Sequence, residues 1–173
     1  MRKKNKGFTL LELIIVLAIT GIIMSIVISV FMNGNKVFSD SSTKTTLQMD
    51  AKDIQEKISD ICMQASSIDY ISGNTENGEI KELVLKLDDT DENISKAKIQ
   101  INNNELNING FKIPSKVSNM KINKEIVDEA YKKNGDLSKF RSINFDIELE
   151  GKKKFGNKIL YPVKFTVAFR NKK

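Results

Sequence analysis

Residues 7–32 read GFTLLELIIVLAITGIIMSIVISVFM, an apolar run that decides how the chain begins to fold. From Phe8 to Met32 the only charged residue is Glu12. A helix of this length is about 37 Å long, which is enough to cross the hydrocarbon core of a bilayer. We therefore expect a transmembrane helix over residues 8–32, preceded by a short basic segment over residues 1–7.

Glu12 needs an explanation, because a charged side chain at the centre of a membrane span costs about 2.5–3.5 kcal/mol. Its distance from Gly7 offers one. A cut between Gly7 and Phe8 would create a new α-amine one helical turn before Glu12. A neighbouring copy, shifted along the helix by about one turn, can then pair its amine with this carboxylate.

The same residues resemble the leader of type IV prepilins and type II secretion pseudopilins. That leader is a short basic peptide, a glycine, and then Phe-Thr-Leu-hydrophobic-Glu, and every position matches here. The resemblance is strong from Arg2 to about Met32 and weak beyond. It implies that a prepilin peptidase cuts after Gly7 and N-methylates Phe8, and that Glu12 docks successive subunits. It also implies three kinds of partner: other pilin or pseudopilin subunits, a platform membrane protein and an assembly ATPase.

A face of small residues runs along the expected span, at spacings of three and four: Ala18, Gly21, Ser25 and Ser29. Such a face lets membrane helices approach closely, although Ser and Gly can also simply be tolerated in an apolar helix. In the pilin family that the leader resembles, many members have a glycine at the position of Gly21, and this glycine helps the helix to loosen inside the filament. Ser29 stands where many pilins have a proline, and this departure favours a minor pilin or a pseudopilin.

Two simpler readings of the N-terminus fit less well. A secretory signal peptide has a shorter apolar core, followed by an Ala-x-Ala-like site that is missing here. An ordinary single-pass anchor explains the length but neither Gly7 nor Glu12. Four cations precede the span and only Lys36 follows it closely, so we expect a cytoplasmic N-terminus and an exported C-terminal part that is extracellular after assembly.

A second apolar pattern follows the span. Its members recur at alternating steps of four and three, as on one face of a helix: Leu47, Ala51, Ile54, Ile58, Ile61, Ala65 and Ile68. We therefore expect an amphipathic continuation of the helix over residues 33–70, loosened at residues 33–35. Coiled-coil pairing is the alternative, but about three heptads are short for it. Cys62 lies beside the stripe and is expected to be a packing residue.

Alternating apolar residues dominate the rest of the chain, over 83–87, 99–101, 106–108, 111–113, 143–149 and 161–169. A short helix is expected within residues 125–133, and Pro162 suggests a late-starting or edge strand. The sequence therefore predicts an α+β fold, in which a long N-terminal helix packs on a C-terminal antiparallel sheet formed by residues 71–173.

Catalytic chemistry has little support. The chain contains no histidine and no Walker-type or paired-glycine phosphate loop. Residues 88–93 resemble the start of a calcium loop, but Ile94 replaces the required glycine and Gln100 the bidentate glutamate, so a solvated turn is preferred. We expect a structural subunit, not an enzyme, with no cofactor and no metal.

Clusters of lysine raise one alternative function. Residues 132–133, 152–154 and 172–173 can contact phosphates, as in a competence-pilus subunit that contacts DNA during uptake. Acidic residues accompany these lysines, so solvated loops are the favoured interpretation. The leading hypothesis is a membrane-anchored precursor that is assembled into a type IV pilus or pseudopilus.

Overall fold

The computed structural model describes residues 8–74, 76–87, 96–153, 156 and 158–169. A long helix, α1 (Leu10–Gln64), begins the described chain and is followed by a sheet. Two compact units can be distinguished, residues 1–41 and residues 42–173. The boundary between them falls within α1, so one helix contributes to both units.

The first unit consists of the apolar part of α1. Its large hydrophobic side chains are exposed from Phe8 to Phe38, and α1 is long and apolar enough to cross a membrane. The predicted loosening at residues 33–35 is wrong, because α1 continues through Gly34 without interruption. A single glycine costs a helix only about 1 kcal/mol relative to alanine, and no proline is present to break it.

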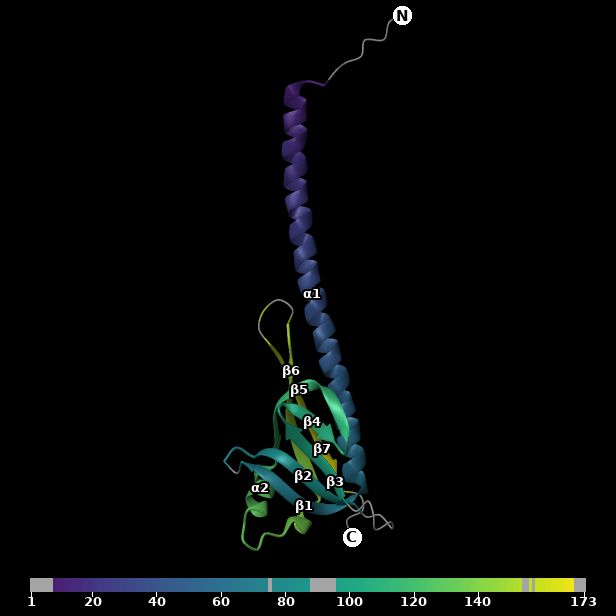
Figure 1. The fold of residues 1–173 in the computed structure, drawn as a ribbon, viewed down its shortest axis with the longest axis vertical. Coiled ribbons are helices and arrows are strands. Elements are labelled where there is room, and N and C mark those ends of the chain that lie inside the picture. The colour runs from purple at the N-terminus through teal and green to yellow at the C-terminus, as the bar shows by residue number, and fades with distance from the viewer. Residues whose placement is uncertain (1–7, 75, 88–95, 154–155, 157, 170–173) are drawn as a thin grey trace, which may run out of the picture. The chain divides into compact units, whose positions relative to one another are not determined.

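The second unit is built on an antiparallel sheet whose strands follow one another in chain order (Figure 1). A short helix and a 3₁₀ turn, α2 (Lys124–Ala130) and η1 (Leu137–Lys139), connect the fifth and sixth strands. The strands are β1 (Ala65–Asn74), β2 (Glu79–Leu87), β3 (Lys96–Asn102), β4 (Glu105–Ile108), β5 (Phe111–Ile122), β6 (Ser142–Gly151) and β7 (Ile159–Ala168). The α+β arrangement predicted from the sequence is thus confirmed, and Pro162 does lie in an edge strand.

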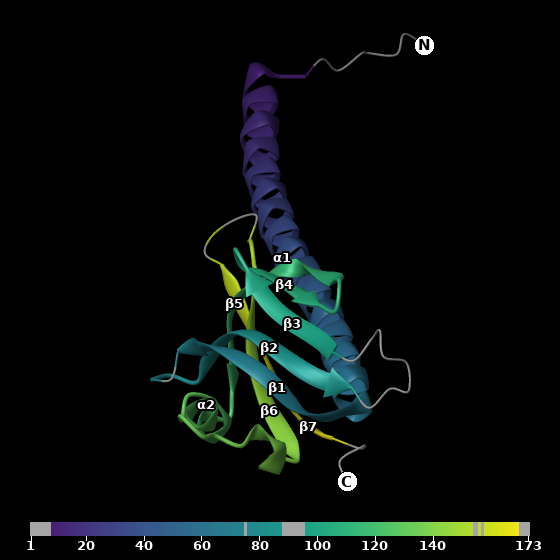
Figure 2. The ribbon, with the colours of Figure 1, turned by 60° about the horizontal axis from the view of Figure 1, so that its bottom comes forward.

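The hydrophobic core forms where the last part of α1 crosses one face of this sheet (Figure 2). Ile54 and Ile58 of α1 are completely buried, and Leu47 is 1% exposed. Facing them are inward side chains of the strands, such as Leu85, Ile99, Val117, Phe145 and Ile147. All buried hydrophobic residues of the described chain lie at or after Leu47. The second unit therefore contains the whole described core.

The helix ends six residues earlier than predicted. It stops at Gln64, and Ala65 and Ile68 are buried in β1 instead of on the helix. These two residues fit the spacing of a helix because the register between β1 and β2 is irregular at Ala65/Ser67 and at Ile68/Tyr70. Each bulge shifts the inward position by one residue, so 65, 68 and 71 face inward at spacings of three. The buried residues of this bulged strand therefore have the same spacing as the residues on one face of a helix.

Cys62 occupies the last inward position on α1. It is completely buried, whereas Ile61 is only partly buried against the core. Burial raises the pKa of the Cys62 thiol to about 12. The expectation that Cys62 is a packing residue is confirmed.

Polar contacts also join α1 to the sheet. A carboxylate oxygen of Asp50 accepts hydrogen bonds from the backbone N–H of Ser115, at 3.0 Å, and from the Ser115 hydroxyl. The ammonium of Lys57 lies 4.0 Å from the ring centroid of Phe111. At the end of β6, a Cβ on Gly151 would lie 2.9 Å from Cδ1 of Leu47, so glycine allows the strand to approach the helix.

Candidate functional site

The predicted processing site lies at the start of the described chain. Gly7 and the rest of the leader fall outside the described residues. Phe8, the residue expected to become the new N-terminus, is 85% exposed. Helix α1 begins two residues later, at Leu10, so Phe8 and Thr9 precede the helix.

Glu12 makes a reciprocal pair of contacts with Thr9 at this helix start. Its Oε2 accepts hydrogen bonds from the backbone N–H and from the hydroxyl of Thr9, both at 2.9 Å. The backbone N–H of Glu12 in turn donates to Oγ1 of Thr9, at 3.3 Å. This arrangement is a capping box, with Thr9 as the N-cap and Glu12 three residues later. In the single chain, the carboxylate therefore already has two donors.

The capping box was missed in the sequence reasoning, although its Thr-x-x-Glu signature was present at Thr9-Leu10-Leu11-Glu12. Glu12 was interpreted only through its cost in a membrane and its distance from the new amine. The structure adds that Thr9 orients the carboxylate at the N-terminal end of α1. Apolar residues surround this turn, and a hollow next to it is lined by Phe8, Glu12, Leu13, Val16 and Leu17.

The four small residues predicted to pack between helices all lie on α1 and are exposed in the single chain. The hydroxyl of Ser25 donates to the backbone carbonyl of Ile22, at 2.7 Å, so its hydrogen bond is made within its own helix. A Cβ on Gly21 would meet no atom within 4 Å. Close packing along Ala18, Gly21, Ser25 and Ser29 stays a prediction.

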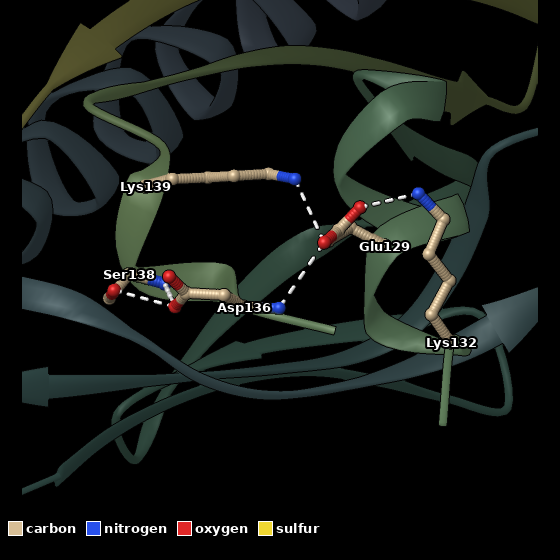
Figure 3. A network of polar contacts seen from close by, with 5 residues as sticks. All are labelled: Glu129, Lys132, Asp136, Ser138 and Lys139. Carbon is tan, nitrogen blue, oxygen red and sulfur yellow. Dashed lines mark hydrogen bonds and ion pairs between the residues drawn. The ribbon is translucent and has the colours of Figure 1, made fainter. Parts of the chain in front are cut away.

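A buried carboxylate in the second unit forms a separate polar network (Figure 3). Glu129, at the end of α2, is 8% exposed. Its Oε2 lies 2.7 Å from the ammonium of Lys132, and its Oε1 lies 2.8 Å from that of Lys139. The backbone N–H of Asp136 donates to the same Oε1, at 3.2 Å. One carboxylate thus joins α2, the following turn and η1.

This network is structural in character. No group of three or more His, Cys, Asp or Glu side chains able to hold a metal occurs in the described part of the chain. The hydrogen bonds from Lys132 and Lys139, and then that from Asp136, lower the pKa of Glu129 to about 2. Ionised Glu129 therefore stabilises the segment between β5 and β6.

The lowered pKa of Glu129 predicts a pH-dependent loss of stability. Because its folded value lies below the ordinary value of 4.5, the stabilisation is complete above about pH 4.5 and disappears as the pH falls toward about 2. At neutral pH, Glu129→Gln should lower the melting temperature of the chain in detergent micelles, measured by circular dichroism. The difference from the wild type should shrink as the pH approaches 2. Glu125→Gln, an exposed change on the same helix, is the control, and a difference that is independent of pH would contradict the assignment.

Several lysines in or beside the sheet form ion pairs with acidic residues of other strands. The ion pairs are Lys96–Asp69, Lys98–Glu82, Lys112–Glu105, Lys121–Glu79, Lys158–Glu150 and Lys164–Asp146. Within the predicted clusters, Lys132 is bound to Glu129. The calcium-like residues 88–93, together with Lys154 and residues 172–173, lie outside the described residues. These ion pairs weaken the hypothesis of a DNA-binding surface.

Comparison with known proteins finds a match to a short motif at the N-terminus. A family model described as "Prokaryotic N-terminal methylation motif" matches residues 2–28, which contain the basic segment, Gly7, Phe8, Thr9 and Glu12. No curated relative and no solved structure matches the chain. The protein therefore carries a type IV prepilin-like leader, followed by a pilin-like fold in which a long helix packs on an antiparallel sheet.

Proposed function

We propose that this protein is a structural subunit of a type IV pilus or pseudopilus, made as a membrane-anchored precursor. The observation that carries the proposal is the match of residues 2–28 to the methylation motif, on a helix apolar enough to span a membrane. A prepilin peptidase is the enzyme that would remove residues 1–7 and methylate Phe8. Other pilin subunits, a platform membrane protein and an assembly ATPase are the further partners.

The precursor sits in the cytoplasmic membrane with its basic leader inside and its second unit outside. Assembly transfers α1 from lipid into a bundle of like helices. There the face formed by Ala18, Gly21, Ser25 and Ser29 permits close approach. The second unit contributes its own complete core and needs no chemistry of its own. The described residues thus support a building block better than an enzyme.

Processing supplies the direct test of this proposal. In cells with an active prepilin peptidase, the intact mass of the membrane protein should correspond to loss of residues 1–7 and gain of one methyl group on Phe8. Gly7→Val should block processing, because a branched side chain would obstruct the scissile bond. Asn5→Val, inside the leader but away from the bond, is the matched control. Retention of Met1 in the wild-type protein would refute the proposal.

A further inference from the structure

The two edge strands of the sheet, β1 and β7, differ in their contacts with the rest of the fold. At the β1 edge, the hydroxyl of Tyr131 accepts a hydrogen bond from the backbone N–H of Gly73 and donates one to its carbonyl, both at 2.8 Å. Helix α2 and the turn η1 lie against this strand, and both ribbon views place α2 beside β1 (Figures 1 and 2). The β1 edge is therefore covered.

At the opposite edge of the sheet, β7 has no second strand as a partner among the described residues. β7 pairs with β6 alone, in a register without interruption from Ser142↔Ala168 to Gly151↔Ile159. In an antiparallel pair, the backbone groups of successive residues point alternately toward the partner strand and away from it. Half of the N–H and C=O groups of β7 must therefore point outward, where another strand can bind them.

One hydrogen bond just beyond β7 shows whether its odd- or even-numbered residues direct their backbone groups away from β6. The N–H of Phe169 donates to the carbonyl of Arg141, which precedes β6, at 2.8 Å. Odd-numbered residues of β7 therefore direct their backbone groups toward β6. Even-numbered residues, including Leu160, Lys164 and Thr166, direct theirs to the open edge.

Pro162 belongs to the outward set. Proline has no N–H, so at an inward position it would remove a hydrogen bond from the pairing with β6. At its actual position, opposite Glu148, it removes a donor only from the open edge. Its ring also projects where the backbone of an added strand would lie. Proline is a residue that natural edge strands use against pairing.

We propose that Pro162 blocks strand addition along the open edge of β7, so that a second copy of this chain cannot extend the sheet through it. The inference needs only the sheet and does not depend on the proposed function. A crowded membrane or filament nevertheless makes the protection valuable, because neighbouring domains are held at high local concentration there. Subunit contacts can then form through other surfaces without competition from the open edge.

Replacement of the proline tests this inference on the full chain in detergent micelles. Pro162→Val should restore the missing donor and raise the fraction of dimers and larger species above that of the wild type at equal concentration, measured by sedimentation velocity. Pro114→Val is the matched control, because Pro114 lies in β5, which has β4 and β6 as neighbours. Adding Leu160→Pro to Pro162→Val moves the proline to another outward position and should return the wild-type distribution. Equal association of wild type and Pro162→Val would overturn the proposal.

A second measurement covers the case in which the valine variant fails to fold. In the wild-type chain, residue-resolved hydrogen exchange should be fast at the amides of Lys164 and Thr166, and slow at those of Val163 and Phe165. Slow exchange at all four amides would show that the outer edge is already paired, and would also overturn the proposal.

Discussion

Replacement of Glu12 by alanine should leave a cleaved, membrane-resident subunit that hardly enters filaments. In lipid, the lone carboxylate carries a desolvation cost, so removing it lowers the free energy of the isolated span in the bilayer. In the filament, the same change would leave the ammonium of a neighbour's Phe8 without its partner. Breaking a buried ion pair by removing one side costs about 3–5 kcal/mol, so incorporation should fall by more than about tenfold. Immunoblots of shear-released filaments from wild type and variant give the measurement.

The capping box makes a sharper comparison possible. Glu12→Gln keeps a side-chain acceptor for the N–H and hydroxyl of Thr9 but removes the charge, because glutamine also serves at this position of a capping box. If pairing with an ammonium docks the subunit, Glu12→Gln should fail nearly as completely as Glu12→Ala. Wild-type incorporation of the glutamine variant would instead assign Glu12 to the start of the helix. Failure of either variant to be cut would place Glu12 in recognition by the peptidase.

Ile58→Asp should unfold the second unit. Ile58 is completely buried between α1 and the sheet, and the substitution both removes a large apolar contact and buries a carboxylate. Loss of the isoleucine alone costs about 2–5 kcal/mol, and the uncompensated charge adds to this, against a total stability of about 5–15 kcal/mol. Circular dichroism of the chain should show loss of the β-sheet signal at temperatures where the wild type is folded.

The control for this change must place the same carboxylate on the same helix outside the core. Gln55 is exposed on α1, so Gln55→Asp should leave the melting temperature within a few degrees of the wild type. Lys57, although also outside the core, is less suitable because its ammonium lies over the ring of Phe111. Equal melting of Ile58→Asp and Gln55→Asp would refute the assignment of helix faces.

The sequence predicts those parts of the fold that depend on residues close together in the chain better than those that depend on contacts between distant segments. The apolar helix over residues 10–32, the buried stripe from Leu47 to Ile58 and the alternation of β6 and β7 follow from local patterns in the sequence, and the structure confirms each of them. The end of α1 was not, because two bulges gave β1 the spacing of a helix. The role of Thr9 was overlooked although it is local.

The contacts of Tyr131 and Glu129 could not be predicted, since they join segments whose proximity only the fold creates. Tyr131 reaches Gly73 across 58 positions of the chain. Glu129 meets Lys139 only because the turn between α2 and η1 brings them together. The leader, in contrast, is a linear motif, so its residues are recognisable in the sequence without any fold.

The burial of Cys62 has a consequence for the proposed filament. Export would bring this thiol into a compartment where disulfides form and persist, and a filament would hold many copies of it close to one another. Burial raises the pKa of the Cys62 thiol to about 12, so the thiol is protonated at pH 7, and the core shields it from solvent. In the proposed filament, adjacent subunits would therefore stay free of disulfide links while the domain is folded. The thiol becomes reactive only when α1 separates from the sheet. Its rate of alkylation therefore reports the rate at which the domain opens.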